Sequence, residues 1–261
     1  MDWLREFFLW TAWKMEKPQA YGAFHLTFFL GGLTVAILLS FLLRKTDEKQ
    51  NRRVLLICGL FLMISELYKQ LFYYYVMGGG SYQWWIFPFQ LCSVPMYLCV
   101  LCAFLKEGRV RQVCYDFLLA FNLMGGFIAF LEPSGLMHEY WTLTLHAFIW
   151  HMMLVFVGLY LGISGRAGKR LSDYFRAALL FLGLAVAAFL INLLFWEVSK
   201  GSINMFYVGP RTSPIAVFKD IAANFGWYVN TPLYLFCLCL AGFLFFLPFR
   251  LWNRRKERKC T

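Results

Sequence analysis

Charged residues are scarce in this 261-residue sequence: Asp, Glu, Lys and Arg together make up 15% of it. Hydrophobic residues account for 61% and aromatic residues for 20%, which is far outside the composition of soluble domains. The apolar runs also lack the residue-by-residue alternation of a transmembrane β-barrel. The sequence therefore predicts an all-α, polytopic membrane protein.

Seven apolar runs are long enough to cross a hydrocarbon core of about 30 Å, which takes roughly 20 helical residues. They cover residues 21–43, 54–77, 85–105, 113–131, 141–163, 176–198 and 227–249. We therefore expect one domain over residues 21–249, built as a seven-transmembrane-helix bundle. No internal repeat and no low-complexity linker divides it.

Lys and Arg are missing from two of the predicted connections, residues 78–84 and 132–140. They gather instead after the first, third and fifth spans and in residues 250–261. Since cytoplasmic loops hold the excess of basic residues, this distribution predicts an outside N-terminus, seven crossings and a basic cytoplasmic tail. The net charge of +11 is then a signal of orientation, and nucleic acid is not an expected partner.

None of the eight cysteines lies in a predicted outer loop, so a disulfide framework is not expected. Cys99 and Cys102 form a CxxC pair inside an apolar span, where we interpret them as packing residues. Residues 1–20 lack the small-residue cleavage site of a signal peptide. Their aromatic residues predict an amphipathic segment in the outer interface.

Polar side chains are rare within the predicted spans, and such residues usually face a cavity or a partner. The exceptions are Glu66, Lys69, Gln90, Cys92, Asn122, His151 and Asn192. Five of them, all but Lys69 and Gln90, fall roughly 9–17 Å below the outer surface when the residues are counted along each helix. The shared depth predicts one polar chamber open to the outer leaflet. The alternative is that each residue only joins helices by hydrogen bonds.

The stretch IFPFQLCSVPM places a thiol beside two prolines, and Pro95 removes a helical hydrogen bond close to Cys92. An irregular backbone at membrane depth is tolerated where it lines a cavity. Cys92 is thus either a small buried hydrophobe or a nucleophile, with His151 as its base and Glu66 as the residue that orients the imidazole. A Glu66–Lys69 ion pair is the alternative role for that carboxylate. We expect no metal and no cofactor, because His146 and His151 are five residues apart and face different sides of one helix.

The connection at residues 199–226 is the only long outer loop. Ser213 and Pro214 predict a helix start, and the apolar face that follows predicts an interfacial helix that could cover the chamber. Asn204, Tyr207 and Arg211 precede this helix as candidate substrate-binding residues. Arg211 suits a lipid phosphate, although an ordinary interfacial anchor is an equal alternative.

Several stretches together resemble a known family: PFQLC, FNLMGGFIAFLEP, HAFIWHMMLVFVGLYL, INMFYVGPRTSP and FGWYVNTPLYL. They are similar to the YwaF-type integral membrane proteins of bacteria, which resemble eukaryotic transmembrane protein 164 and, more distantly, the androgen-induced membrane lipid hydrolases. The resemblance implies acyl transfer by a cysteine and a histidine, or ester cleavage by a threonine and a histidine. Carried onto this sequence, it implies Cys92 as nucleophile and His151 as base, with Gln90 standing where many members have histidine.

These observations lead to an expected function, which is intramembrane lipid acyl transfer or acyl hydrolysis in the bacterial cytoplasmic membrane. Its expected partners are phospholipid and lysophospholipid, and the sequence leaves the oligomeric state open. Gln90, Asn122 or Asn192 would hydrogen-bond the developing oxyanion. The alternative is a non-enzymatic transporter, binding or sensory protein. A transporter would typically show inverted repeats, which this sequence lacks.

Overall fold

The computed structural model describes residues 2–210 and 215–260, and every regular element in those ranges is helical. In chain order the elements are α1 (Asp2–Trp10), α2 (Ala23–Leu42), η1 (Leu43–Lys45), α3 (Glu48–Phe72), η2 (Tyr73–Met77), η3 (Trp84–Ile86), α4 (Val94–Phe104), α5 (Arg109–Phe117), η4 (Leu118–Asn122), α6 (Leu123–Leu131), η5 (Pro133–Leu136), α7 (Trp141–Ile163), α8 (Leu171–Leu194), η6 (Met205–Tyr207), α9 (Ala216–Phe225) and α10 (Trp227–Cys260). The all-α prediction is confirmed.

Six helices among the described residues are long and apolar enough to cross a membrane. They are Ala23–Lys45, Glu48–Met77, Arg109–Leu131, Trp141–Ile163, Leu171–Leu194 and Trp227–Arg255. Six of the seven expected spans thus correspond to long helices, with ends shifted by a few residues. The multi-pass character of the protein is confirmed.

The prediction of one continuous helix over residues 85–105 is wrong. That region contains a single turn of 3₁₀ helix at η3, a non-helical stretch at 87–93 and then α4, which has 11 residues and is only about 16 Å long. The segment still runs along most of α3, because Gln70 bonds the carbonyl of Ile86 while Arg52 bonds the carbonyl of Ala103. Pro95 explains the late start, since proline favours the first turn of a helix over its interior.

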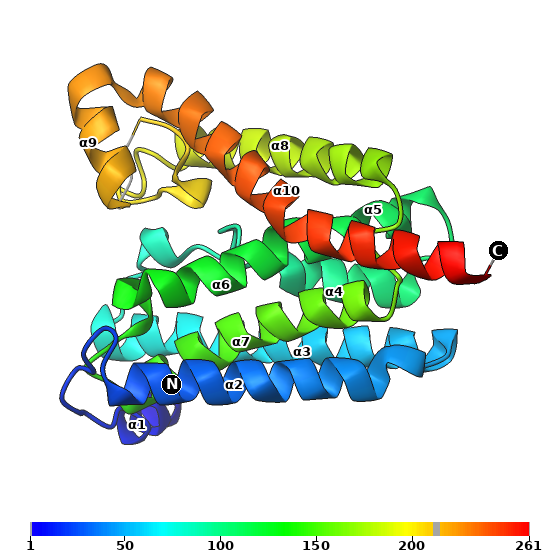
Figure 1. Cartoon of the computed structure of the whole chain (residues 1–261). Helices are drawn as coiled ribbons and strands as arrows, with labels where there is room; N and C mark the ends of the chain where they lie inside the picture. The colour runs from blue at the N-terminus through cyan, green and yellow to red at the C-terminus, as the bar shows by residue number, and fades with distance from the viewer. Residues whose placement is uncertain (1, 211–214, 261) are drawn as a thin grey trace.

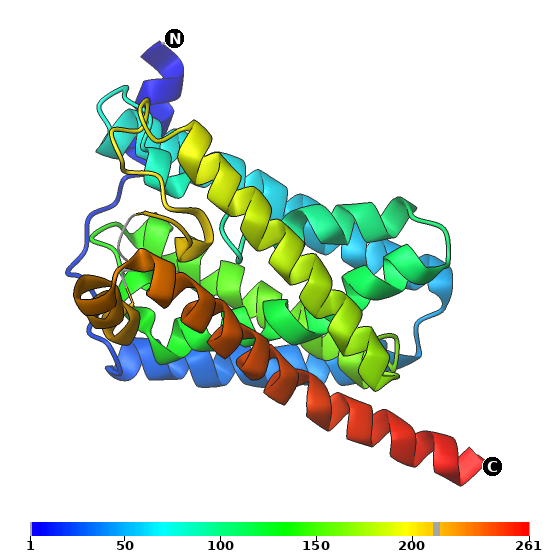
Figure 2. The same cartoon turned by 90° about the horizontal axis from the view of Figure 1, so that it is seen from above.

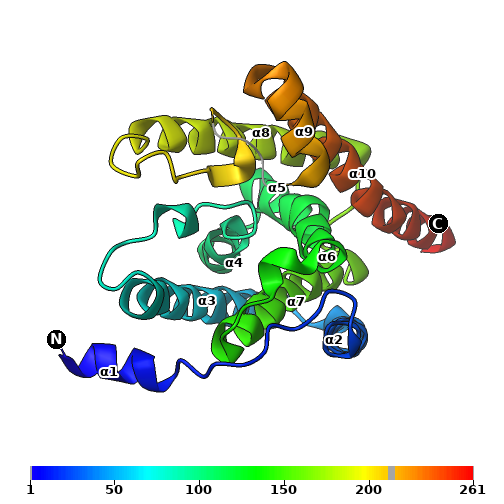
Figure 3. The ribbon, with the colours of Figure 1, turned by 90° about the vertical axis from the view of Figure 1, so that its left-hand side faces the viewer.

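The helices form three layers. Viewed along the bundle, α2, α3 and α7 lie on one side, α8, α9 and α10 lie on the other, and α4 to α6 lie between them (Figure 3). Burial agrees with this arrangement. In the most apolar 18 residues of Arg109–Leu131, 72% are buried, whereas the corresponding fraction for Ala23–Lys45 is 11%. The outer helices expose large apolar side chains such as Leu42, Ile64, Leu179 and Phe236. Such an apolar exterior suits contact with lipid.

The central layer packs closely against α7 at two glycines. A Cβ atom added at Gly158 would lie 2.6 Å from the Cβ atom of Leu123, and one at Gly126 would lie 3.0 Å from the carbonyl oxygen of His151. Both distances leave no room for a side chain. Small residues therefore let α6 and α7 approach backbone to backbone, as is common between membrane helices.

The two termini lie at opposite ends of the bundle (Figure 1). At one end, the chain after α1 pairs with the segment before α7: the amide of Met15 donates to the carbonyl of Glu139, and the amide of Trp141 donates to that of Trp13. At the other end, α10 continues through the predicted basic tail as a helix and extends past its neighbours (Figure 2). Residues 2–20 thus form a short helix and a docked strand-like segment.

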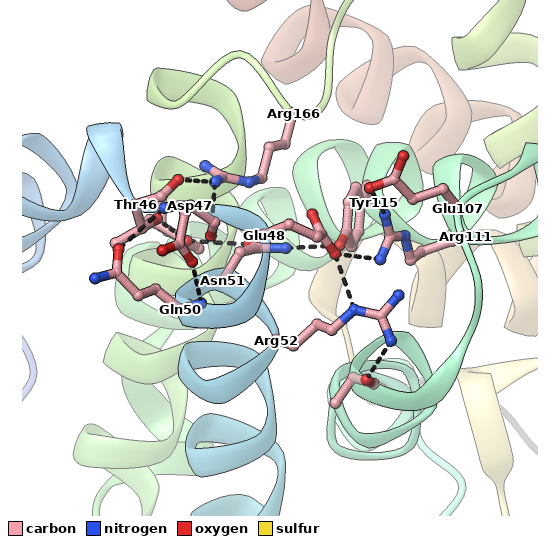
Figure 4. Close-up of polar contacts among 12 residues, drawn as sticks. Thr46, Asp47, Glu48, Gln50, Asn51, Arg52, Glu107, Arg111, Tyr115 and Arg166 are labelled. Carbon is pink, nitrogen blue, oxygen red and sulfur yellow. Dashed lines mark hydrogen bonds and ion pairs between the residues drawn. The ribbon is translucent and has the colours of Figure 1, made fainter.

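The second of these ends, which we call the basic end, holds η1, the start of α5 and the connection between α7 and α8. A polar network joins these parts (Figure 4). Arg111 is 5% exposed and pairs with Glu48 and with Glu107, the latter at 3.3 Å. Arg166 donates to the carbonyl of Thr46. Because a buried guanidinium needs paired carboxylates, Arg111 fixes α3 against α5.

Candidate functional site

Cys92 lies in the non-helical stretch that precedes α4. The amide of Ser93 donates to the carbonyl of Gln90 at 2.8 Å, which closes a turn around the cysteine. The indole of Trp150 on α7 donates to the carbonyl of Cys92 at 3.1 Å. Cys92 is half-buried against Leu62, Trp150 and neighbouring side chains. Its thiol therefore stands immediately before the N-terminus of α4, at a position that α7 holds in place.

Lys69 on α3 acts electrostatically on this cysteine, together with the carboxylate of Glu66. Its ammonium pairs with Glu66 at 2.8 Å and lies 5.9 Å from the ring centre of Trp150. It also acts electrostatically on both Cys92 and His151. The ammonium of Lys69 favours a thiolate at residue 92, whereas burial and the carboxylate of Glu66 oppose it.

Glu66 is 4% exposed, and both of its carboxylate oxygens have partners. One accepts from Lys69, and the other accepts from the amide of Gln70 at 2.6 Å. Gln70 also donates to the carbonyl of Ile86, just before the cysteine-bearing stretch. Of the two roles that the sequence left open, the structure shows the pair with Lys69. No hydrogen bond joins Glu66 to His151 in the described part of the chain.

His151 is half-buried on α7, and its Nδ1 lies 2.8 Å from the carbonyl oxygen of Ala147. Because a carbonyl can only accept, Nδ1 carries the proton and the neutral imidazole keeps its lone pair on Nε2. The described residues include no hydrogen bond between His151 and Cys92. The catalytic pair therefore stays a prediction, but His151 has the tautomer that a base requires.

Two predicted oxyanion donors, Gln90 and Asn192, hold the segment around η6 instead. Asn192 accepts from the amide of Met205 at 2.6 Å and donates to the carbonyls of Met205 and Val208. Gln90 accepts from the amide of Phe206 and donates to the carbonyl of Asn204, both at 2.9 Å. These side chains therefore serve as clamps that seat residues 204–208 beside the cysteine-bearing stretch.

Asn122, the third predicted donor, lies in the core and is 1% exposed. Its amide donates to the carbonyl of Leu118 at 3.2 Å and to that of Leu154 on α7 at 2.8 Å. The five residues Leu118–Asn122 form a π-helical turn, which is wider than a turn of α-helix. Asn122 thus matches the alternative reading of a residue that joins two helices.

Tyr207 and Asn204 lie in the clamped segment, whereas Arg211 lies outside the described residues. Phe206 and Tyr207 both have positive φ, at 53° and 55°, which is rare for such side chains and is maintained here by the clamps. Burial, together with a smaller effect of the charge of nearby Cys92, raises the pKa of Tyr207 to about 12. Tyr207 therefore stays protonated near neutral pH and can donate a hydrogen bond close to the thiol.

Two residues near Cys92 were not predicted from the sequence. Trp150 binds the carbonyl of Cys92. Tyr234 on α10 is 5% exposed, and Cys92 and Tyr207 both act on it electrostatically. An aromatic residue in an apolar span carries no signal of its own, because most such residues only pack. The described residues contain no group of three or more His, Cys, Asp or Glu that could hold a metal ion.

The clamp made by Gln90 can be tested by Gln90→Leu. This change strands the amide of Phe206 and the carbonyl of Asn204, and each stranded buried group costs about 1–3 kcal/mol. We expect a lower unfolding temperature in detergent, measured by tryptophan fluorescence. Gln83→Leu is the matched control, because Gln83 makes only a local 3.4 Å bond to Ser81. Equal unfolding temperatures for the two variants would contradict the clamp.

The chain was also compared with known proteins. The family model of the TMEM164 family matches residues 20–249, which include all the site residues named above. Neither the curated proteins nor the solved structures contain a match to this chain. The match covers far more than half of the sequence and all six long helices in large part. The chain therefore belongs to the TMEM164 family.

Proposed function

We propose that this protein transfers acyl groups between membrane lipids, with Cys92 as the nucleophile. The observation that carries the proposal is the position of the thiol, immediately before the N-terminus of α4 and within electrostatic range of Lys69. The positive end of a helix and a nearby ammonium both favour a thiolate. The resemblance to proteins that use a cysteine and a histidine for acyl transfer supports the same role.

In the proposed reaction, Nε2 of His151 takes the proton of the Cys92 thiol. The thiolate attacks the carbonyl carbon of a phospholipid ester, the carbon–oxygen bond breaks, and the leaving lysolipid alkoxide takes the proton from the imidazolium. A lysophospholipid hydroxyl, or water, then attacks the thioester and gives its proton to the same nitrogen. The carbon–sulfur bond breaks, and the released Cys92 thiolate takes this proton back from the imidazolium. The two side chains would come into hydrogen-bond reach when substrate is bound, as catalytic contacts often tighten in that state.

The oxyanion of each tetrahedral intermediate needs a donor other than the clamping amides. Tyr207 meets this need in the proposal, because its phenol stays protonated and lies close enough for Cys92 to act on it electrostatically. Gln90 and Asn192 then support it indirectly, by holding its backbone. Glu66 is a positioning residue that fixes Lys69.

The direct test uses purified protein in liposomes that contain a phospholipid with a labelled acyl chain and an unlabelled lysophospholipid. Label should move to the lysophospholipid or appear as free fatty acid, and mass spectrometry should detect an acyl group on Cys92. A protein that is folded in the liposomes but moves no label, with any of several headgroups, would overturn the proposal.

The proposal includes seven crossings, an outside N-terminus and a cytoplasmic C-terminus in a bacterial membrane, with phospholipid and lysophospholipid as partners. It predicts that Ser81→Cys reacts with a membrane-impermeant maleimide added to intact cells. Gln50→Cys, which is exposed at the basic end, should react only after the cells are permeabilised. The parent for this test carries Cys260→Ser, because the native cysteine of the cytoplasmic tail would also react after permeabilisation, and it should itself show no labelling in intact cells. The reverse pattern at residues 50 and 81 would contradict the orientation.

A further inference from the structure

A cleft of about 420 Å³ opens at the basic end, between the first turns of α5 and α8. Its lining includes four cationic residues, Arg109, Lys169, Arg170 and Arg176, against two carboxylates, Asp116 and Asp173. All four cations are exposed, whereas both carboxylates are buried. The cleft therefore presents positive charge to whatever enters it.

The carboxylates neutralise only part of this charge. Asp173 pairs with Arg176 at 3.1 Å, and Asp116 accepts from the amide of Gly168 at 2.8 Å and from Gln112 at 2.9 Å. No salt bridge joins Arg109 or Lys169 to a carboxylate in the described part of the chain. Two cations of the cleft are thus available to an external anion.

The connection that carries Lys169 and Arg170 is held firmly from two sides. On the α5 side, Gln112 donates to the carbonyl of Arg166 at 2.9 Å, in addition to the contacts of Asp116. On the α10 side, Asn253 donates to the carbonyls of Ala167 and Gly168, at 3.0 and 3.2 Å. Hydrogen bonds from two helices fix this backbone, so the segment that carries the cations does not need to be ordered by a ligand first.

The dipoles of α5 and α8 add to the positive potential of the cleft. Both α5 and α8 point their N-termini toward it, and each begins a helix long enough to cross a membrane. Gly108 precedes α5 and offers no side chain to cap it. The first amide groups of α5 therefore lack a side-chain partner, and helix N-termini favour anions.

We propose that this cleft binds the phosphate of an anionic phospholipid headgroup. Four cations and two helix N-termini suit a phosphate, and arginine can bind two of its oxygens at once. The cleft lies where two membrane-spanning helices begin, which is the depth at which headgroups lie. It is at the opposite end of α4 from Cys92, so the proposal does not depend on the proposed acyl transfer.

Binding can be measured on the full chain in a non-ionic detergent, as the rise in unfolding temperature with concentration of dioctanoyl phosphatidic acid. The double variant Arg109→Gln/Lys169→Gln should bind about 10- to 30-fold more weakly, since each cation near anionic lipid contributes about 1 kcal/mol. Both side chains are exposed and unpaired, so the variant should fold, and size-exclusion chromatography checks this. The matched control Lys49→Gln/Arg53→Gln removes two exposed charges from the same end, outside the cleft.

Two further probes separate a lipid from a soluble phosphate. Glycerol 3-phosphate and inorganic phosphate should stabilise the protein much less than phosphatidic acid, and equal stabilisation would overturn the lipid assignment. Dioctanoyl phosphatidylcholine should bind weakly, and an affinity equal to that of phosphatidic acid would overturn the need for a net negative headgroup. An equal loss in the cleft variant and the control variant would overturn the site itself. Lys169→Gln alone provides the same comparison if the double variant is unstable.

Discussion

Cys92→Ser is expected to lower acyl transfer by at least about 10³-fold while the protein stays folded. Serine has nearly the volume of cysteine, but its hydroxyl is far harder to ionise than a thiol. The turn at Cys92 is held through its backbone carbonyl by Trp150, so the change of side chain leaves this contact intact. The acyl group attached to residue 92 should disappear together with turnover.

His151→Ala should produce a loss of similar size, and combining it with Cys92→Ser should cost little more. Members of one catalytic unit are strongly non-additive, because the second change removes a function that is already lost. The measurement is the rate of label transfer in liposomes for both single variants, the double variant and the parent. Cys237→Ser is the matched control, since Cys237 is also a half-buried free cysteine but lies on α10.

A different outcome would favour the binding or transport alternative. In that case Cys92→Ser and His151→Ala would leave the measured activity at the level of the parent. Ligand binding would instead depend on Glu66, Asn122 and Arg211. Wild-type transfer rates in both catalytic variants, together with a folded parent that works, would remove Cys92 and His151 as the catalytic pair.

Asn192→Leu is expected to be the most destabilising single change proposed for this chain. Leucine fills a similar volume, but it leaves the amide of Met205 and the carbonyls of Met205 and Val208 without their partner. These two residues are 0% and 1% exposed, so water cannot replace the lost bonds. At about 1–3 kcal/mol for each stranded group, the total reaches several kcal/mol.

The loss can be measured as the unfolding temperature in detergent and as the fraction of folded protein after extraction. Asn224→Leu is the matched control, because Asn224 also donates to a backbone carbonyl, that of Asp220 at 2.9 Å, but is exposed on α9. We expect a small change there. A similarly small change at Asn192 would mean that the segment around η6 is held by packing alone. Tyr207 would then not depend on the clamp for its position.

The polar residues of the candidate site show which properties of the site could be predicted from the sequence. Their rarity in apolar spans correctly marked Glu66, Gln90, Asn122 and Asn192 as residues with partners. The roles of these residues could not be predicted from the sequence, because a side-chain amide can donate equally well to a ligand or to a backbone carbonyl. Apart from that of Leu118, the carbonyls in question belong to residues 13 to 114 positions away, and no local spacing identifies such a partner.

The first part of the third predicted span shows the same limit of prediction from sequence. Two prolines around Cys92 indicated an irregular backbone, and the structure has one. Sequence reasoning placed a kink inside a helix, whereas α4 begins only at Val94 with Pro95 in its first turn. Proline is compatible with both arrangements, and the backbone before Val94 is fixed by distant partners, Trp150 and residues 204–206.

The sequence by itself determined that this protein is an all-helical membrane protein and where its six long helices lie. A hydrocarbon core requires long apolar segments whose backbone groups bond within the same helix, and both properties are local. Only the tertiary structure decided that Glu66 pairs with Lys69 and Gln70, that Asn192 and Gln90 seat Tyr207 near Cys92, and that Arg109 meets Lys169 at one cleft. These pairings depend on which faces of helices meet, because helical periodicity gives each side chain a direction but not a neighbour.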